Sequence, residues 1–255
     1  MDFKEMKHQA FELFEANKKD YTLILLIICL ISLLPSLLLL IDDQRLLIVY
    51  GLLVLILLPI HQGQIIASLN IVEGKHLRKE DSLIGLRRFP AYFTTYLMTN
   101  VIEFILIALA IIVFGVLGFV IISIINFNFT GVCSVILSIL IIIVLMIPLL
   151  VIILKIMSVF LLVPYLLTED IRNFKNMRLS FRCMKSHFRD YLKIHLSFLP
   201  YYILFIVFMI VLAVIDNNEF INNIFVNVMA ILTFLPKYDL TLALFYKEIY
   251  EKIIE

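Results

Sequence analysis

The most regular pattern of charged side chains lies between Glu169 and Lys193. Apolar side chains recur there every three or four residues, at Phe174, Met177, Phe181, Met184 and Phe188. Basic side chains keep the same spacing, at Arg172, Lys175, Arg178, Arg182, Lys185 and Arg189. These periods place the two sets on different faces of one helix. We therefore expect a helix that lies on the inner leaflet of a membrane, with its cations against anionic lipid head groups.

A basic cytoplasmic segment also has a simpler explanation, because such loops are basic in helical membrane proteins whatever else they do. Two further segments favour lipid contact. Residues 3–14 carry an apolar stripe among charged residues, and residues 75–88 hold five more cations. Three basic segments on one side of a membrane are typical of a protein that binds the cytoplasmic leaflet. Each cation near that surface contributes about 1 kcal/mol of attraction to anionic lipids.

Four polar side chains lie inside apolar runs, where ionisable groups are costly and often functional. Glu103 and Lys155 fall in neighbouring predicted spans and in the same half of the membrane, so an ion pair between them is a hypothesis. The alternative is that each reaches water separately. His61 and Gln64 share a helical face with Ser68. Such a face indicates hydrogen bonds between helices, or alternatively a substrate path.

No catalytic or cofactor motif is present. The sequence lacks a zinc-protease, nucleophile-elbow, P-loop or dinucleotide-binding signature. Cys29, Cys133 and Cys183 lie far apart, which suggests neither disulfides nor a thiolate metal site. Asp170 and Asp239 lie near predicted membrane ends, but the sequence gives neither a partner. We expect no bound metal, no cofactor and no nucleic-acid partner.

Composition indicates a membrane protein, since 63% of the 255 residues are hydrophobic and 16% are charged. The apolar runs lack the alternation of barrel strands, so they must be helices. We predict an all-α polytopic bundle, a single integral domain over residues 1–255. Its six spans cover about residues 21–41, 46–69, 96–125, 132–167, 195–215 and 220–236. Pro148 should bend or break the fourth span.

Lysine and arginine predict the orientation. Of the 21 such residues, Arg45 falls in an outer loop and Lys155 in a span, and the others lie in segments that share one side. Positive charge marks the cytoplasmic side. We therefore expect a multi-pass protein with both termini in the cytoplasm.

Several short motifs in the C-terminal half resemble a known family. They include Leu167-Thr168-Glu169-Asp170, Met184-Lys185-Ser186-His187 and Leu196-Ser197-Phe198. The sequence is similar to the uncharacterised bacterial membrane family catalogued as domain of unknown function nine hundred seventy-five. That family's second motif usually reads Met-Lys-Gly-His, so Ser186 departs from it. The resemblance implies a multi-span protein of a bacterial plasma membrane and brings no activity or catalytic residues.

Taken together, these features favour a non-enzymatic protein of the bacterial cell envelope. It would act through anionic inner-leaflet lipids or a membrane protein partner, in a setting such as envelope stress or peptide resistance. The first alternative is a transporter or accessory permease subunit with a polar path at His61, Gln64, Glu103 and Lys155. The second is a membrane enzyme that acts on lipid.

Overall fold

The chain is built of helices connected by short turns. The computed structural model describes residues 3–41, 45–129, 131–215 and 219–254, and no strand occurs among them. The α-helices are α1 (Phe3–Leu33), α2 (Leu46–Leu57), α3 (Gln62–Val72), α4 (Ile84–Arg87), α5 (Phe89–Asn128), α6 (Val132–Phe160), α7 (Val163–Thr168), α8 (Asn173–Ile215), α9 (Glu219–Thr233) and α10 (Leu235–Ile254). The 3₁₀ helices are η1 (Leu34–Leu40), η2 (Leu58–His61) and η3 (Lys79–Leu83).

Five helical stretches of the described chain are long and apolar enough to cross a membrane. A sixth forms if α9 and α10, which meet at a bend of 58°, count as one broken span. This confirms the predicted all-α membrane bundle of about six spans. Because a break exposes backbone groups, a bent span needs neighbours that satisfy them.

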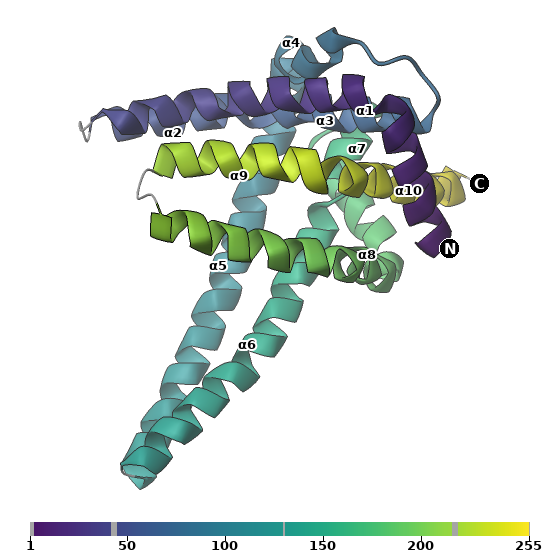
Figure 1. Cartoon of the computed structure of the whole chain (residues 1–255). Coiled ribbons are helices and arrows are strands. Elements are labelled where there is room, and N and C mark those ends of the chain that lie inside the picture. Colours follow the sequence, from purple (N-terminus) through teal and green to yellow (C-terminus); the bar gives the residue numbers. More distant parts are fainter. Residues whose placement is uncertain (1–2, 42–44, 130, 216–218, 255) are drawn as a thin grey trace.

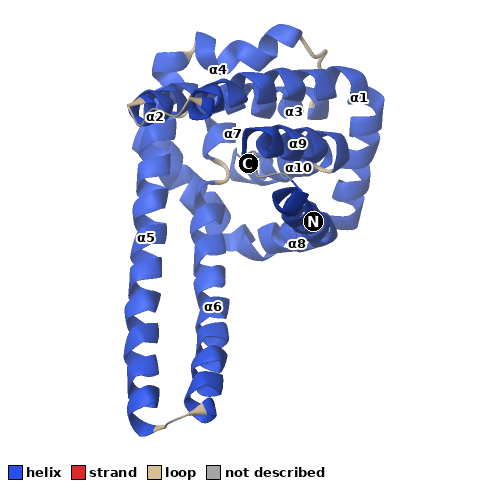
Figure 2. Ribbon diagram, turned by 60° about the vertical axis from the view of Figure 1, so that its left-hand side comes forward, coloured by secondary structure: helices blue, strands red, loops and turns tan. Residues whose placement is uncertain are grey.

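The helices divide into a packed group and a projecting hairpin. Figure 1 shows α1, α9 and the later part of α8 running side by side, with both ends of the chain at one end of this group. The α5–α6 hairpin extends away from the other helices in both views (Figures 1 and 2). The most apolar stretches of α5 and α6 bury no residue within the chain. Hydrocarbon can solvate such a surface, so the hairpin needs no protein cover.

Two helices run further than the sequence pattern predicts. α1 joins the charged N-terminal segment to the first span without interruption. α8 joins the basic segment to the fifth span, so that segment is the first part of a 43-residue helix and does not form a helix of its own. No glycine or proline lies between Asn173 and Leu199 to end the helix, and Pro200 is accommodated inside it.

Two other prolines lie where helical stretches are interrupted. Pro148 lies within the continuous α6, and the interruption comes later, at Leu161 and Leu162, before α7, which has Pro164 in its first turn. The second span is interrupted at Pro59, which converts residues 58–61 to a 3₁₀ turn. A proline removes one backbone hydrogen bond but is tolerated in the first turn of a helix, and Pro164 and Pro59 both occupy that position.

Two buried apolar clusters hold the packed group together. The first cluster lies between α8 and α10 and includes Tyr191, Phe198 and Phe245. The second lies between α1, α3 and α10 and includes Phe14 and Ile24. Met6, Ala10 and Phe14 of the N-terminal apolar stripe are all buried, so this stripe packs against the protein's own helices.

The segment after α3 folds back onto the Pro59 break. A Cβ atom at Gly85 would lie 1.7 Å from the carbonyl oxygen of Pro59, and one at Gly63 would lie 2.5 Å from that of Ser82. Real Cβ atoms do not approach backbone this closely. Glycine is therefore required at both positions for α4 and η3 to cover the break.

Replacing Gly85 with alanine should unfold the protein at a lower temperature. The added methyl group must displace the Pro59 backbone, and overpacking of this kind costs about 2 kcal/mol. Thermal denaturation of the purified protein, followed by size-exclusion chromatography, measures the loss. Gly51→Ala is the control, because nothing lies within 4 Å of its new methyl group. Equal melting temperatures for the two variants would contradict the close approach.

Candidate functional site

The packed interior contains a buried carboxylate. Asp239 of α10 is 5% exposed. Its Oδ2 accepts a hydrogen bond of 2.7 Å from the Gln64 amide of α3 and one of 3.4 Å from the Tyr21 hydroxyl of α1. Pro236 stands in the first turn of α10 and Asp239 follows one turn later, near the positive end of the helix dipole. Three helices are thus joined at one oxygen atom.

A second polar contact joins α3 to two other helices. Gln62 is buried at the start of α3. Its amide nitrogen donates to the Pro164 carbonyl at 2.8 Å, and its amide oxygen accepts from the Tyr96 hydroxyl at 2.8 Å. This side chain therefore connects α3 to α7 and α5.

Three tyrosine rings form a stack that begins beside this buried region. Tyr165 of α7 is fully buried. Its ring stacks on Tyr246 with centroids 5.0 Å apart, and Tyr246 stacks on Tyr250 at 5.3 Å. We call Tyr165, Tyr246 and Tyr250 the tyrosine column. It leads from the interior toward the C-terminal part of α10.

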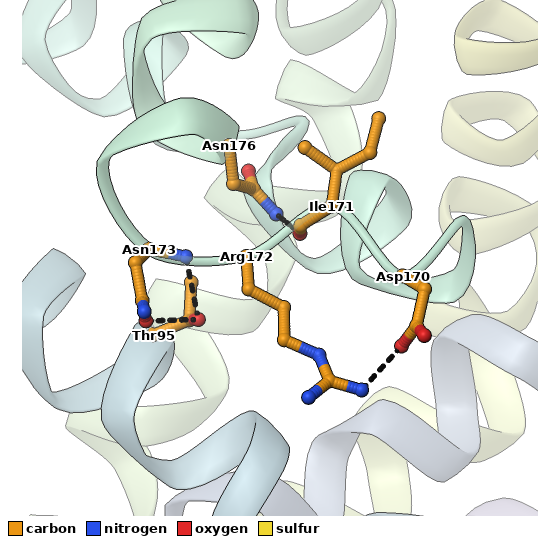
Figure 3. A network of polar contacts seen from close by, with 6 residues as sticks. All are labelled: Thr95, Asp170, Ile171, Arg172, Asn173 and Asn176. Carbon is orange, nitrogen blue, oxygen red and sulfur yellow. Dashed lines mark hydrogen bonds and ion pairs between the residues drawn. The ribbon is translucent and has the colours of Figure 1, made fainter.

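The turn between α7 and α8 is held by the polar network shown in Figure 3. Asp170 and Asn173 have positive φ angles of 60° and 54°, a conformation that Asp and Asn adopt more readily than most residues. The Thr95 hydroxyl of α5 accepts from the Asn173 backbone at 3.0 Å and donates to its side-chain oxygen at 3.2 Å. The Asn176 amide donates to the Ile171 carbonyl at 2.7 Å. These bonds fix where α8 begins.

Five of the six predicted lipid-contact residues lie on α8, and Arg172 directly precedes this helix. All six are exposed: Arg172, Lys175, Arg178, Arg182, Lys185 and Arg189. Arg172 pairs with Asp170 at 2.6 Å, and the other five have no acidic partner among the described ion pairs. Phe174 and Phe181 of the same segment are 70% and 52% exposed, whereas Met177 and Met184 are buried. We call the six cations with these two phenylalanines the basic face of α8.

The four predicted intramembrane residues occupy different environments. Gln64 contacts Asp239 as described, and His61 is exposed at the end of η2. Glu103 is partly buried on α5, and Lys155 is exposed on α6. The ion pairs among the described residues do not include one between Glu103 and Lys155. Among the described side-chain hydrogen bonds and ion pairs, Gln64 is the one of the four that contacts another helix.

Sequence reasoning missed the partners of Asp239. The sequence shows an isolated aspartate, and the structure gives it two donors from helices more than 170 residues away. The available signal was an acidic residue three positions after Pro236, at the end of an apolar run. Asp170, the other aspartate considered, lies in the α7–α8 turn and pairs with its neighbour Arg172.

Thr95→Val should weaken the attachment of α5 to the start of α8. The change keeps the shape of the side chain and removes both bonds to Asn173, each worth about 1 kcal/mol. Thr94→Val is the control, since the Thr94 hydroxyl bonds only within its own helix, to Pro90. Hydrogen exchange measured by mass spectrometry should show faster exchange at residues 169–176 in the Thr95 variant only. Identical exchange in both variants would contradict the attachment.

The Gln64–Asp239 bond should appear as coupling between two substitutions. Gln64→Leu and Asp239→Leu each leave a buried polar partner without its bond, and the double variant removes both. The double variant should therefore lose about 1 kcal/mol less than the sum of the single losses. Unfolding titrations with sodium dodecyl sulfate measure the three values. Losses that add within about 0.3 kcal/mol would show that the residues do not interact.

Comparison with known proteins identifies a family without assigning an activity. No curated protein and no solved structure matches the chain. The family model described as "Protein of unknown function (DUF975)" matches residues 1–252. Because this match covers almost the whole sequence, the chain belongs to the DUF975 family.

Proposed function

We propose that this chain is a non-enzymatic, multi-pass protein of the bacterial plasma membrane that binds anionic lipids of the cytoplasmic leaflet. The basic face of α8 is the binding surface. Both termini lie on the same side as this face, in the cytoplasm. The distribution of lysine and arginine along the sequence supports this orientation.

The observation that carries the proposal is the exposure of unpaired cations on consecutive turns of α8. Lys175, Arg178, Arg182, Lys185 and Arg189 have no acidic partner among the described ion pairs, so they are available to phosphate groups. Lys and Arg near an anionic surface contribute about 1 kcal/mol each. Phe174 and Phe181 add exposed aromatic rings beside the cations. Such rings favour the boundary between head groups and acyl chains.

The buried face of α8 explains why the cations stay in place. Met184 and Tyr191 pack in the cluster shared with α10. The Ser180 hydroxyl donates to the Val159 carbonyl of α6, and the Asn176 amide donates to the Val163 carbonyl of α7 at 3.0 Å. The helix cannot rotate without breaking these contacts. A fixed rotation keeps all of the basic face pointing outward, which a mobile loop would not do.

Replacing Arg178, Arg182 and Lys185 together with glutamine should weaken binding of phosphatidylglycerol at least tenfold. Loss of three cations removes up to about 3 kcal/mol of attraction. Binding of phosphatidylcholine, which has no net charge, should not change. Native mass spectrometry of the full chain, released from nanodiscs of each lipid, counts the bound molecules.

The matched control is the triple variant Lys18→Gln, Lys193→Gln and Lys252→Gln. It changes the net charge equally but removes cations already paired with Glu15, Asp190 and Glu248. It should keep its affinity for phosphatidylglycerol. If both triple variants lost equal affinity for phosphatidylglycerol, the effect would come from net charge alone. If the first variant also lost affinity for phosphatidylcholine, the binding would not be electrostatic.

A further inference from the structure

Two lysine side chains from distant parts of the chain meet at the ring of Phe11. The Lys7 ammonium group of α1 lies 5.7 Å from the centre of this ring, and the Lys237 ammonium group of α10 lies 4.7 Å from it. Both lysines are partly buried, and the ion pairs of the described residues include neither of them. Charges withdrawn from water are usually paired. The two lysines therefore create a local positive charge that these ion pairs do not neutralise.

The ammonium group of Lys7 is fixed against α8. It donates a hydrogen bond of 3.0 Å to the Ser197 carbonyl oxygen and lies 4.7 Å from the centre of the Phe198 ring. An ammonium group has three N–H donors, so this bond leaves two for another acceptor. Lys193 is the last charged residue of α8, and Ser197 follows one turn later. Lys7 thus places a cation where the apolar part of α8 begins.

An apolar groove of about 180 Å³ lies between α8 and α9. Its lining includes Tyr201 and Phe208 of α8, Met229 of α9, and Phe234, which directly follows α9. The rings of Tyr201 and Phe234 stack with centroids 6.0 Å apart, so the two helices meet there. Lys237 follows Phe234 by three residues. The groove and the second cation are therefore neighbours along the chain.

The groove and the first cation share one side of α8. In order, this side carries Ser197, Tyr201, Leu204 and Phe208. Steps of three or four residues keep side chains on one helical face. Lys7 bonds to the first of these residues, and the other three line the groove. The stretch from the first to the last rises about 16 Å, which is roughly half of a hydrocarbon core of about 30 Å and thus the depth of one leaflet.

We propose that these elements bind one anionic phospholipid, with its phosphate between Lys7 and Lys237 and an acyl chain in the groove. Phosphate oxygens accept charge-assisted hydrogen bonds from ammonium groups. An acyl chain matches both the apolar lining of the groove and its depth of one leaflet. The site contains no residue of the basic face of α8, so it does not depend on lipid binding there.

Photo-crosslinking locates the bound lipid. The full chain is placed in phosphatidylcholine nanodiscs that contain a small fraction of phosphatidylglycerol with a diazirine in one acyl chain. After illumination and digestion, mass spectrometry identifies the labelled peptides. The label should fall on residues 201–208 of α8 and 229–234 beside them. Absence of label from both segments would overturn the proposal.

The double variant Lys7→Gln with Lys237→Gln tests the phosphate contacts. Labelling of the groove should fall at least about tenfold, because two cations are lost. The double variant Lys193→Gln with Lys252→Gln is the control, since both of its lysines are already in ion pairs. Labelling in the control should stay within about twofold of that in the unaltered chain. Equal loss in the two double variants would overturn the proposal.

Two further measurements separate this site from a folding defect and from the basic face of α8. A phosphatidylcholine probe with the same diazirine should label the groove equally in the unaltered chain and in the Lys7–Lys237 variant. An equal fall for both probes would overturn the phosphate contacts, because the lysines would then act only through folding. The glutamine variant of Arg178, Arg182 and Lys185 should keep its groove labelling. Loss of that labelling would mean that the groove is not a separate site.

Filling the groove tests the position of the acyl chain. Met229→Trp places a larger apolar side chain in the groove without changing any charge, so labelling of residues 201–208 should fall about tenfold as the acyl chain loses its contacts. Leu232→Trp is the control, because Leu232 is 59% exposed on the same helix and does not line the groove. Circular dichroism confirms that both variants are folded. Unchanged labelling in the Met229 variant would overturn the proposal.

Discussion

A carboxylate is stable in an apolar interior only where donors reach it, and three helices of this protein meet at that point. The Gln64 amide and the Tyr21 hydroxyl both bond to Asp239. Gln64 lies in the first turn of α3, after the break at Pro59, and Asp239 lies near the start of α10, after the break between α9 and α10. The two helices that begin after these breaks, α3 and α10, therefore meet at the Asp239 carboxylate. Because leaving this group unpaired would be costly, the interaction constrains both breaks together.

The other parts of the molecule follow from how each surface is solvated. The α5–α6 hairpin exposes apolar side chains all round, which hydrocarbon accommodates. The start of α8 exposes cations, which water or lipid phosphate accommodates, while its opposite side is fixed by the α7–α8 turn. Thr95, Asn173 and Asn176 hold that turn through bonds to backbone and side-chain atoms. Packing inside the chain therefore decides which charges face outward.

Much of this fold can be predicted from hydropathy, because a span must satisfy its backbone within one helix. The number of spans and the all-α class depend on nothing else. The continuity of α8 was missed, since a change from basic to apolar residues looks like a boundary but contains no residue that ends a helix. The partners of Asp239 were missed for a different reason. Helical periodicity shows which residues share a face, and it does not show which distant helix packs there.

The central claim is that the basic face of α8 lies at the cytoplasmic surface, across the membrane from the tip of the α5–α6 hairpin. Cys133 is exposed next to that tip, whereas Cys183 is buried and Cys29 is partly buried. A membrane-impermeant maleimide should therefore label Cys133 on intact bacterial cells that express the chain. In a Cys133→Ser background, Arg182→Cys should react only after the membrane is permeabilised. Labelling of the Arg182→Cys thiol on intact cells would contradict the account.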